Sequence, residues 1–517
     1  MARYKHIDRN PKFIPVVLDA QLMAGSFEYA LDYLIDHELD LTRFDVHYKN
    51  DDTGAPAYAP SVLLKIVLLA YSRGMVSSRA IERACRENVL FMAISGDSAP
   101  QFTTIAKFVR ELSTEIHDVF TQVLLTCDTQ GLIGRQMFAI DGVKLPSNAS
   151  KHRSGTHAEL AHDAARMEKA VSTLLKAHQA RDLQSDTVNT QQERQADQRR
   201  IDKYQKEAKR IRDFIAANAE RRNAKGKELK SNVTDNESAK MATAKGVIQG
   251  YTAVAAVDSQ HQIIVAAKAH GSGSEQSTLL PMVRATDAIR RSDTLITADA
   301  GYHSEDNVRA LHEANIPALI ADGLMRKRDE KFKGQHKYKS LPDPIADKTK
   351  TAEQLKAAQA KHRYLPKDFI LDANHNRCIC PAGKALYSNG SRCTIGGRMY
   401  HRFTGNKTNC TSCTQREKCL RTPDKTEVRQ VSFLIKEQAL PVTLIEKMKR
   451  EIDSPEGRRK YSERMGTVEP VFGNLRYNKG LDRFTLRSQI KVDTQWNLFC
   501  LVHNIEKLAH CGYGARR

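Results

Sequence analysis

The sequence has little of what a membrane-bound or exported protein needs. In its 517 residues no apolar run approaches the roughly 18 to 20 residues that a membrane span requires. The first six residues, Met1 to His6, lack the apolar core of a signal peptide. These two absences predict a soluble, intracellular protein.

Acidic residues are also scarce relative to basic ones. Asp and Glu number 61 against 81 for Lys and Arg, which gives a net charge of +20 and a pI near 9.4. Such an excess favours a polyanionic partner, with nucleic acid the first candidate and an acidic membrane surface the second. A solvated basic surface without a partner is the plainer alternative. The length allows roughly two to four domains, so no disulfide or metal is needed merely for folding.

One carboxylate stands at the end of an apolar run. Residues 137–140 predict a strand buried on both faces, and Asp141 follows it, which is costly unless a cation meets it. The same pattern returns where Asp299 follows the apolar residues 294–298. Carboxylates at the carboxyl ends of two strands mark the edge where an α/β sheet usually holds its ligand. Taken alone, each Asp could equally be a turn or helix cap.

A third carboxylate, Glu469, lies in the segment 467–473 beside a basic region. Together with Asp141 and Asp299 it could bind two Mg²⁺ (or Mn²⁺) ions, which prefer oxygen ligands and can polarise a phosphodiester from both sides. Pro470 follows it directly. Because the residue before a proline disfavours helical geometry, we expect Glu469 to cap a helix that begins at Pro470 or to sit at a kink.

The patterns around these residues predict a mixed α/β sheet. Residues 250–258 and 262–268 form a predicted hairpin, a helix spans 279–289, and a further strand covers 318–322. Residues 1–130 are predicted to be mostly helical, with a turn at Gly74. Short helices of this kind can present one member to a DNA groove, although an ordinary helical bundle fits the pattern as well.

A long polar insertion interrupts the sheet after Pro146. Two of its stretches repeat apolar residues at alternating spacings of four and three, and a polar break at 182–192 separates them. We predict two antiparallel helices forming a coiled-coil hairpin over 155–230. A dimerisation arm, a DNA clamp or a simple spacer would each fit. The repeating positions are Leu160, Ala164, Met167, Val171 and Leu174, then Ile201, Tyr204, Ala208, Ile211 and Ile215.

Most of the cysteines are concentrated in one short region. Six of the ten fall between 378 and 419, and in a reducing compartment this grouping favours metal binding over disulfides. Thiolates at such spacing suit a structural zinc knuckle, while catalytic zinc is disfavoured because four thiolates leave no open position. Cys378 and Cys393 remain possible ligands, and a set of unliganded thiols is the alternative. The predicted ligands are Cys380, Cys410, Cys413 and Cys419.

Residues 432–510 return to helix and hold the densest positive charge. Phosphate contact explains this better than a solvated helix face, which would intersperse both signs. The segment 494–504 contains the only Trp and is expected to pack on the sheet. The basic residues are Lys447, Lys449, Arg450, Arg458, Arg459, Lys460, Arg464, Arg476, Lys479, Arg483, Arg487 and Lys491.

Read in order, these motifs resemble the DDE-type transposases of bacterial insertion sequences, close to the insertion sequence 1182 group. The resemblance covers nearly the whole chain. In the helical N-terminal region it rests on 48–50, 78–82 and 103–108. In the remainder it rests on three blocks: 138–142 with 147–150, 299–302, and 468–476 with 480–484.

The resemblance implies a ribonuclease-H-like catalytic core with helices on both faces of its sheet. Asp141, Asp299 and Glu469 match the metal-binding triad of that family. Four residues separate Arg464 from Glu469 here, where the family pattern has three. The predicted DNA contacts are Lys144, Tyr461, Arg464, Arg476 and Arg483.

The activity implied is binding of terminal inverted repeats, cleavage at the element's ends and joining of the 3′-hydroxyls to target DNA. It further implies a homodimer or higher oligomer on DNA and a place in the bacterial cytoplasm, at the nucleoid. A metal-dependent nuclease that does not join strands, and a DNA-binding protein that has lost catalysis, are the alternatives. The predicted domains are a DNA-binding or oligomerisation domain at 1–130, the two parts of the catalytic domain at 131–322 and 431–517, and a basic, cysteine-rich insertion at 323–430.

Overall fold

The structure is a computed structural model that describes residues 15–48, 50, 56–182, 188–223, 226–243, 246–329, 363–372, 377–395, 398–434 and 443–514. The chain forms two compact units. The core unit comprises Met1–Met325 and Leu444–Arg517, and the cysteine unit comprises Arg326–Thr443. Part of the predicted basic insertion, 330–362, lies outside the described residues.

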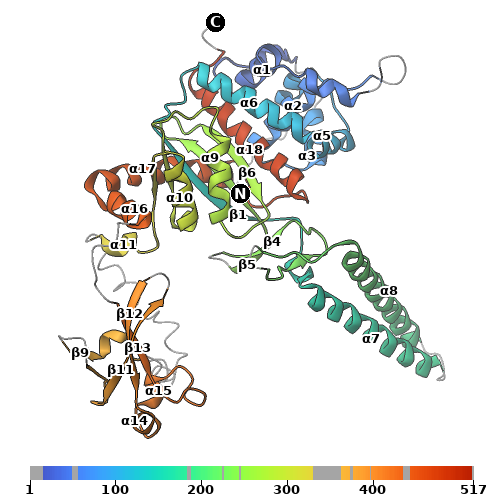
Figure 1. Cartoon of the computed structure of the whole chain (residues 1–517). Coiled ribbons are helices and arrows are strands. Elements are labelled where there is room, and N and C mark those ends of the chain that lie inside the picture. The colour runs from blue at the N-terminus through green and yellow to red at the C-terminus, as the bar shows by residue number, and fades with distance from the viewer. Residues whose placement is uncertain are drawn as a thin grey trace, which may run out of the picture. The chain divides into compact units, whose positions relative to one another are not determined.

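A mixed sheet forms the centre of the core unit (Figure 1). Its strand order is β4–β5–β1–β7–β8, and β6 also pairs with β5. β1 runs parallel to β7 and antiparallel to β5, and β7 runs parallel to β8. The predicted mixed α/β class is confirmed, and the order is consistent with a ribonuclease-H-like core. The strands are β1 (Met137–Pro146), β4 (Ala239–Thr243), β5 (Gly246–Asp258), β6 (Ile264–His270), β7 (Leu295–Ala298) and β8 (Ala318–Ile320).

Helices α9, α16 and α17 pack on strands of this sheet, and α10 packs on α9 and α16. α17 contacts β1, β5 and β7, α9 contacts β5 and β6, and α16 contacts β8 and α10. The helix predicted over 279–289 ends earlier, at Ala285, where the hydroxyl of Thr286 donates to the carbonyl of Val283 at 2.6 Å. The helices are α9 (Leu279–Ala285), α10 (Glu305–Glu313), α16 (Leu444–Asp453) and α17 (Pro455–Gly473).

The expectation that Glu469 caps a helix beginning at Pro470 is wrong, because α17 continues through both residues. The alternative, a kink at this position, stays a prediction. A proline at position 470 removes the hydrogen bond to the carbonyl four residues earlier, and its ring crowds that carbonyl. Here that residue is Gly466, whose carbonyl accepts a hydrogen bond from the Gln262 side chain at 3.0 Å. The tertiary contact therefore replaces the missing helical bond. A π-helical turn, Asn474–Asn478, follows directly.

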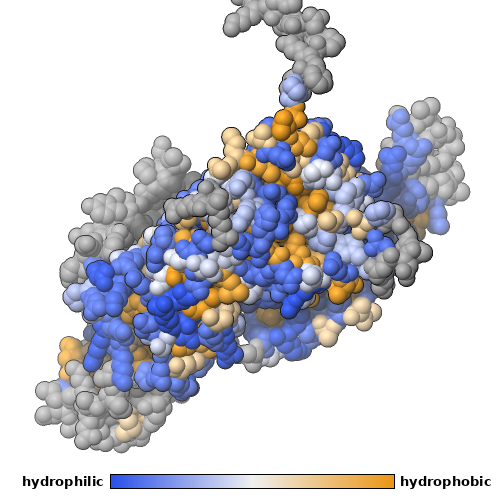
Figure 2. Space-filling view, turned by 90° about the horizontal axis from the view of Figure 1, so that it is seen from above, coloured by the Kyte–Doolittle hydropathy of each residue, from blue (hydrophilic) through white to orange (hydrophobic). Residues whose placement is uncertain are grey.

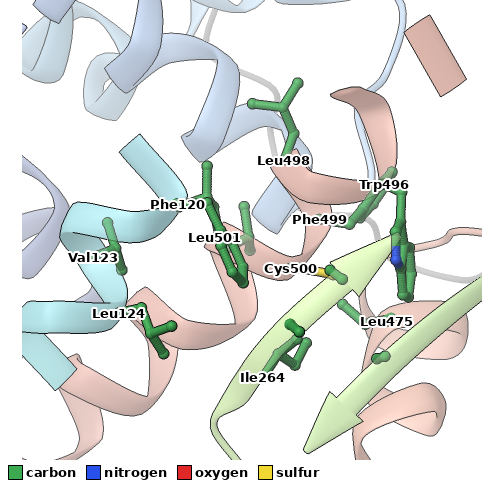
Figure 3. Close-up of a cluster of buried hydrophobic side chains, with 14 of the residues drawn as sticks. Phe120, Val123, Leu124, Ile264, Leu475, Trp496, Leu498, Phe499, Cys500 and Leu501 are labelled. Carbon is green, nitrogen blue, oxygen red and sulfur yellow. The ribbon is translucent and has the colours of Figure 1, made fainter. Parts of the chain in front are cut away.

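The N-terminal helices share one hydrophobic core with the sheet, because the C-terminal helix α18 (Gln489–His510) packs against both. Figure 3 shows Phe120 from α6, Ile264 from β6 and Leu501 from α18 in this cluster. Trp496 is fully buried and donates through Nε1 to the carbonyl of Val254 at 3.1 Å, so its predicted core role is confirmed. The N-terminal helices are α1 (Phe27–His37), α2 (Pro60–Ser72), α3 (Ser78–Glu87), α4 (Val89–Ser95), α5 (Phe102–Glu111) and α6 (Ser113–Thr129).

The polar insertion forms two helices, α7 (His157–Asp182) and α8 (Val188–Ala217), which pack along one another in opposite directions (Figure 1). Their shared core includes Leu160 and Ala164 from α7 with Ala208 and Ile211 from α8. Four of the predicted apolar positions thus face the partner helix. Supercoiling of the pair, as in a coiled coil, stays a prediction.

The cysteine unit contains an antiparallel sheet of order β13–β12–β11–β10–β9. Its core is small and consists of Phe369, Cys378, Leu386, Phe403 and Val431, with partly buried neighbours. Sequence patterns did not predict these strands, since two of them are only two residues long. The elements are β9 (Ile370–Leu371), β10 (Cys378–Ile379), β11 (Ala385–Ile395), β12 (Arg398–Gly405), α14 (Lys407–Thr411), α15 (Arg416–Cys419) and β13 (Gln430–Leu434).

The surface is mixed in polarity. Hydrophilic side chains cover much of the face seen in Figure 2, with hydrophobic ones interspersed among them. In the part of the chain that the structure describes, no helix has both the length and the apolar character needed to cross a membrane.

Candidate active site at the edge of the sheet

The register of two parallel strands brings Asp141 and Asp299 close together, where the β1–β7 pairing stops. The predicted strand end at Asp141 is wrong, because β1 continues to Pro146 by pairing with β5, whereas Asp299 directly follows β7. β1 and β7 pair with Ile140 opposite Ala298, and each of these residues is followed by an aspartate. Neighbouring strands lie about 4.8 Å apart, so the two carboxylates originate from adjacent points on the sheet. Residues 158 positions apart in the sequence thus meet through one strand pairing.

Asp141 lies in a partly buried, charged setting. Its Oδ2 contacts the Arg464 guanidinium at 2.8 Å, and its Oδ1 accepts a hydrogen bond from the Gly142 amide at 2.8 Å. Burial raises the pKa of Asp141, the charge of Asp299 raises it further, and Arg464 and Gly142 oppose both effects. A carboxylate whose charge is costly in this way gains from a nearby cation.

Asp299 is held at the start of a short 3-10 helix, η5 (Ala300–Tyr302), where its Oδ1 accepts from the Gly301 amide at 2.8 Å. Tyr302 is fully buried behind it, and its hydroxyl has no hydrogen-bond partner among the described residues. Burial raises the pKa of Tyr302, and the charges of Asp141, Glu275 and Asp299 raise it further. The phenol therefore stays neutral beside a group of carboxylates.

Sequence reasoning missed Glu275. It lies in the loop after β6, a strand that runs parallel to β1 because both are antiparallel to β5, so its carboxyl end is at the same edge of the sheet. A Cβ atom placed on Gly301 would lie 2.2 Å from Glu275 Oε2 and 3.0 Å from Asp299 Oδ1, so these two carboxylates are close. The sequence feature that could have identified Glu275 is its position as an acidic residue in the loop after a third strand of this sheet.

Glu469 is not brought together with the two aspartates. It is exposed on α17, and in the part of the chain described no hydrogen bond or ion pair joins it to Asp141 or Asp299. Arg464, on the same helix, does reach Asp141. Because successive helical residues are rotated by about 100°, positions 464 and 469 point roughly 140° apart. Val468, one turn after Arg464, is buried instead.

The predicted DNA contacts fall into two groups. Arg476 and Arg483 are exposed. The Arg476 guanidinium lies 5.9 Å from the ring of Tyr477, which is 82% exposed, and Arg483 donates to the Ser147 carbonyl at 3.3 Å. The other three are buried or half-buried. Lys144 forms an ion pair with Glu275 at 3.0 Å, Tyr461 packs against residues including Ile452, and Arg464 holds Asp141.

The edge offers an incomplete set of metal ligands. Asp141 and Asp299 supply carboxylate oxygens of the type that Mg²⁺ and Mn²⁺ prefer. Arg464 already places a cation at Asp141, which indicates that the site can accept positive charge. Across the residues that the structure describes, no three His, Cys, Asp or Glu side chains stand in an arrangement that could hold a metal ion. A third carboxylate would have to move toward Asp141 and Asp299 to complete a metal-binding group.

The predicted zinc ligands lie in the cysteine unit, where all four line a single cavity. The two alternatives do not. Cys378 is buried in β10 within the small core of the unit, and Cys393 lies on β11 opposite Tyr400.

Two comparisons with known families give matches. Residues 379–509 match the family described as "Transposase DDE domain", and residues 16–111 match "Transposase domain (DUF772)". The first match includes Arg464, Glu469 and the four cysteines but begins after Asp141 and Asp299. The second covers α1 to α5. A search of curated proteins found no match.

Proposed function

We propose, on the premise that the two matched domains indicate a DDE-type insertion-sequence transposase, that this protein cleaves the ends of its element and joins them to target DNA. Its catalytic site would be the sheet edge at Asp141 and Asp299. The narrower assignment to the insertion sequence 1182 group fits the N-terminal match and is part of the proposal.

The observation that supports this most is the pairing of Ile140 with Ala298 in adjacent parallel strands. It gives two carboxylates a common position at a sheet edge without help from any flexible loop. Burial raises the pKa of Asp141 by more than the Arg464 guanidinium lowers it, so a further cation would favour the charged carboxylate. Such a pair suits divalent cations better than it suits a purely structural role.

In this proposal Asp141 and Asp299 hold divalent metal, Mg²⁺ or Mn²⁺, with Glu469 as the third ligand. Bound there, two such ions would activate the attacking oxygen and stabilise the leaving oxygen of a phosphodiester. Asp141 must be deprotonated to act, and Arg464 helps by stabilising its charged form. Arg464 would also balance negative charge when DNA phosphate approaches.

Glu469 would reach the aspartates by rotation of the last turn of α17. Two features favour such movement. Pro470 leaves this part of the helix without one internal hydrogen bond, and the π-helical turn Asn474–Asn478 follows it. Wide turns of this kind occur mostly within α-helices at functional sites.

DNA would be held by the basic residues near this edge. Arg476 and Arg483 are exposed to solvent where phosphates could approach, although Arg483 also donates to the Ser147 carbonyl at 3.3 Å. Lys144, Tyr461 and Arg464 would have to leave or share their present contacts. Phosphate contacts position the duplex without reading its sequence. Recognition of the terminal repeats would fall to α1 to α6, and bringing two ends together requires at least a dimer.

The test uses a labelled duplex from the DNA that flanks the coding sequence, a target plasmid and Mg²⁺. Joined products from the purified protein support transposition. Nicks without joining would favour a metal-dependent nuclease, and a shifted but uncut duplex a DNA-binding protein. The Asp299→Ala variant should keep end binding and lose cleavage, so loss of both would count against its role.

A further inference from the structure

Four cysteines from two separate segments of the cysteine unit line one cavity of about 40 Å³. Cys380 comes from the turn after β10, Cys410 and Cys413 from α14 and the turn after it, and Cys419 from the end of α15. The four thiols therefore face a common space.

The turn that presents Cys380 is built around its sulfur. The Gly383 amide donates to the Cys380 carbonyl at 2.8 Å, and the Lys384 amide donates to Cys380 Sγ at 3.3 Å. Gly383 adopts a φ of +74°, which a residue with a side chain rarely takes. A backbone amide aimed at a cysteine sulfur stabilises the thiolate, the form that binds metal.

On the opposite wall, Gly405 leaves room for Cys410. A Cβ atom at Gly405 would lie 2.6 Å from Cys410 Sγ, too close for any real side chain. Arg416 holds this wall in place. Its guanidinium donates to the carbonyls of Cys410 and Pro423 at 2.9 and 2.8 Å, and it also bonds the carbonyls of Thr426 and Glu427.

We propose that Cys380, Cys410, Cys413 and Cys419 bind one structural zinc ion as thiolates. Four sulfur ligands suit tetrahedral Zn²⁺, and Mg²⁺ or Ca²⁺ would not compete for them. Each thiol gives up its proton to solvent on binding, so no oxidant or reductant is needed. The site has no open ligand position, which makes it structural and separates it from the carboxylate edge.

Binding would draw the sulfurs inward. Within the described ranges no three such side chains already stand as a metal-binding group, so the cysteines must rotate toward the centre of the cavity. The ion would then join two segments that the small core of this unit holds weakly, since that core comprises only a few buried side chains. Metal-binding energy adds directly to folding energy in such units.

The test measures metal in the full-length protein, purified reduced and without chelators. We expect about one zinc per chain, and Co²⁺ in its place should give the visible spectrum of tetrahedral thiolate coordination. Cys413→Ser should lose most of the metal. Cys393→Ser and Cys511→Ser, which change cysteines outside the cavity, should retain it, as should Asp299→Asn.

A second measurement uses the protein without substitutions, so its result does not depend on whether a variant folds. Alkylation followed by peptide mapping should find the four cavity cysteines protected, and a strong chelator should expose all four together. Three results would overturn the proposal: no retained metal with all thiols reactive, metal kept by Cys413→Ser, or disulfides joining these cysteines. None of them bears on the carboxylate edge, so the proposed function would stand or fall separately.

Discussion

The carboxylate edge of the core unit and the cysteine cavity of the cysteine unit gather their side chains in different ways. At the edge, strand pairing joins residues that are 158 positions apart but leaves Glu469 on another face of its helix. In the cavity, ligands spread over only 40 residues all face one space. In the two proposals, the hard oxygen ligands thus form an open, adjustable site and the soft sulfur ligands a closed one. This contrast matches the proposed roles, since one site would admit DNA and the other would only hold its own chain together.

A substitution that affects only the carboxylate edge should give the largest change in DNA cleavage. Asp141→Asn should lower cleavage about a thousandfold or more, because several kcal/mol of transition-state stabilisation depend on the metal it helps to hold. The same variant should keep the thiolate-bound metal of the cysteine unit. Cleavage assays with metal analysis of the same sample check both. Loss of both properties together would mean that the two regions are not independent.

The next largest effect comes from comparing substitutions of Glu469 and Glu275, which tests which of them is the third metal ligand. Glu469→Gln should lower cleavage about a hundredfold, and Glu275→Gln less than about tenfold, because Glu275 is already paired with Lys144. Glu463→Gln is the matched control, since it is exposed on the same helix and pairs only with Arg459. The reverse order of Glu469 and Glu275 would assign the third position to Glu275.

The ion pair beneath the edge should affect stability. Arg464→Gln leaves the partly buried Asp141 without its cation and should cost about 2 kcal/mol of unfolding free energy, less than a fully buried pair because Asp141 retains some exposure. Arg459→Gln removes an exposed pair on the same helix and should cost less than about 0.5 kcal/mol. Urea unfolding compares them. Equal losses of unfolding free energy in the two variants would show that the Arg464–Asp141 pair stabilises the protein no more than an exposed pair does.

The smallest effect is a dependence on pH. Since the folded pKa of Asp141 lies above its ordinary value of 3.8, its contribution to stability is present below that value and is lost as pH rises through the folded pKa. Asp299→Asn removes one cause of the shift and should stabilise the protein at pH 7 by on the order of 1 kcal/mol. The gain should fade toward pH 4. Thermal unfolding across this range tests it, and a destabilised variant at pH 7 would contradict it.

Several features could be predicted from short stretches of sequence. The apolar run before Asp141, the hairpin at 250–268 and the buried Trp496 follow from periodicity that does not depend on distant residues. The close spacing of Cys410 and Cys413 likewise predicted that both belong to one site, and both line the cavity. In each case local pattern and tertiary environment require the same residue type.

Other features depended on contacts that no local pattern encodes. The sequence placed a helix boundary at Pro470, but the Gln262 side chain supplies the hydrogen bond that proline removes, and the helix continues. Glu275 escaped notice because only the pairing of β5 with both β1 and β6 brings its loop to the edge of the sheet. The packing of α17 also decides that Arg464 points toward Asp141 and that Glu469 does not.

The sequence by itself determined the basic charge, the apolar runs that precede Asp141 and Asp299, and the four cysteines, because composition and short periodic patterns act locally. Only the tertiary structure decided which of these side chains meet. Strand register and helix rotation are set by packing across the whole core, and a rotation of about 100° per helical residue is enough to turn one neighbour toward the site and the next away.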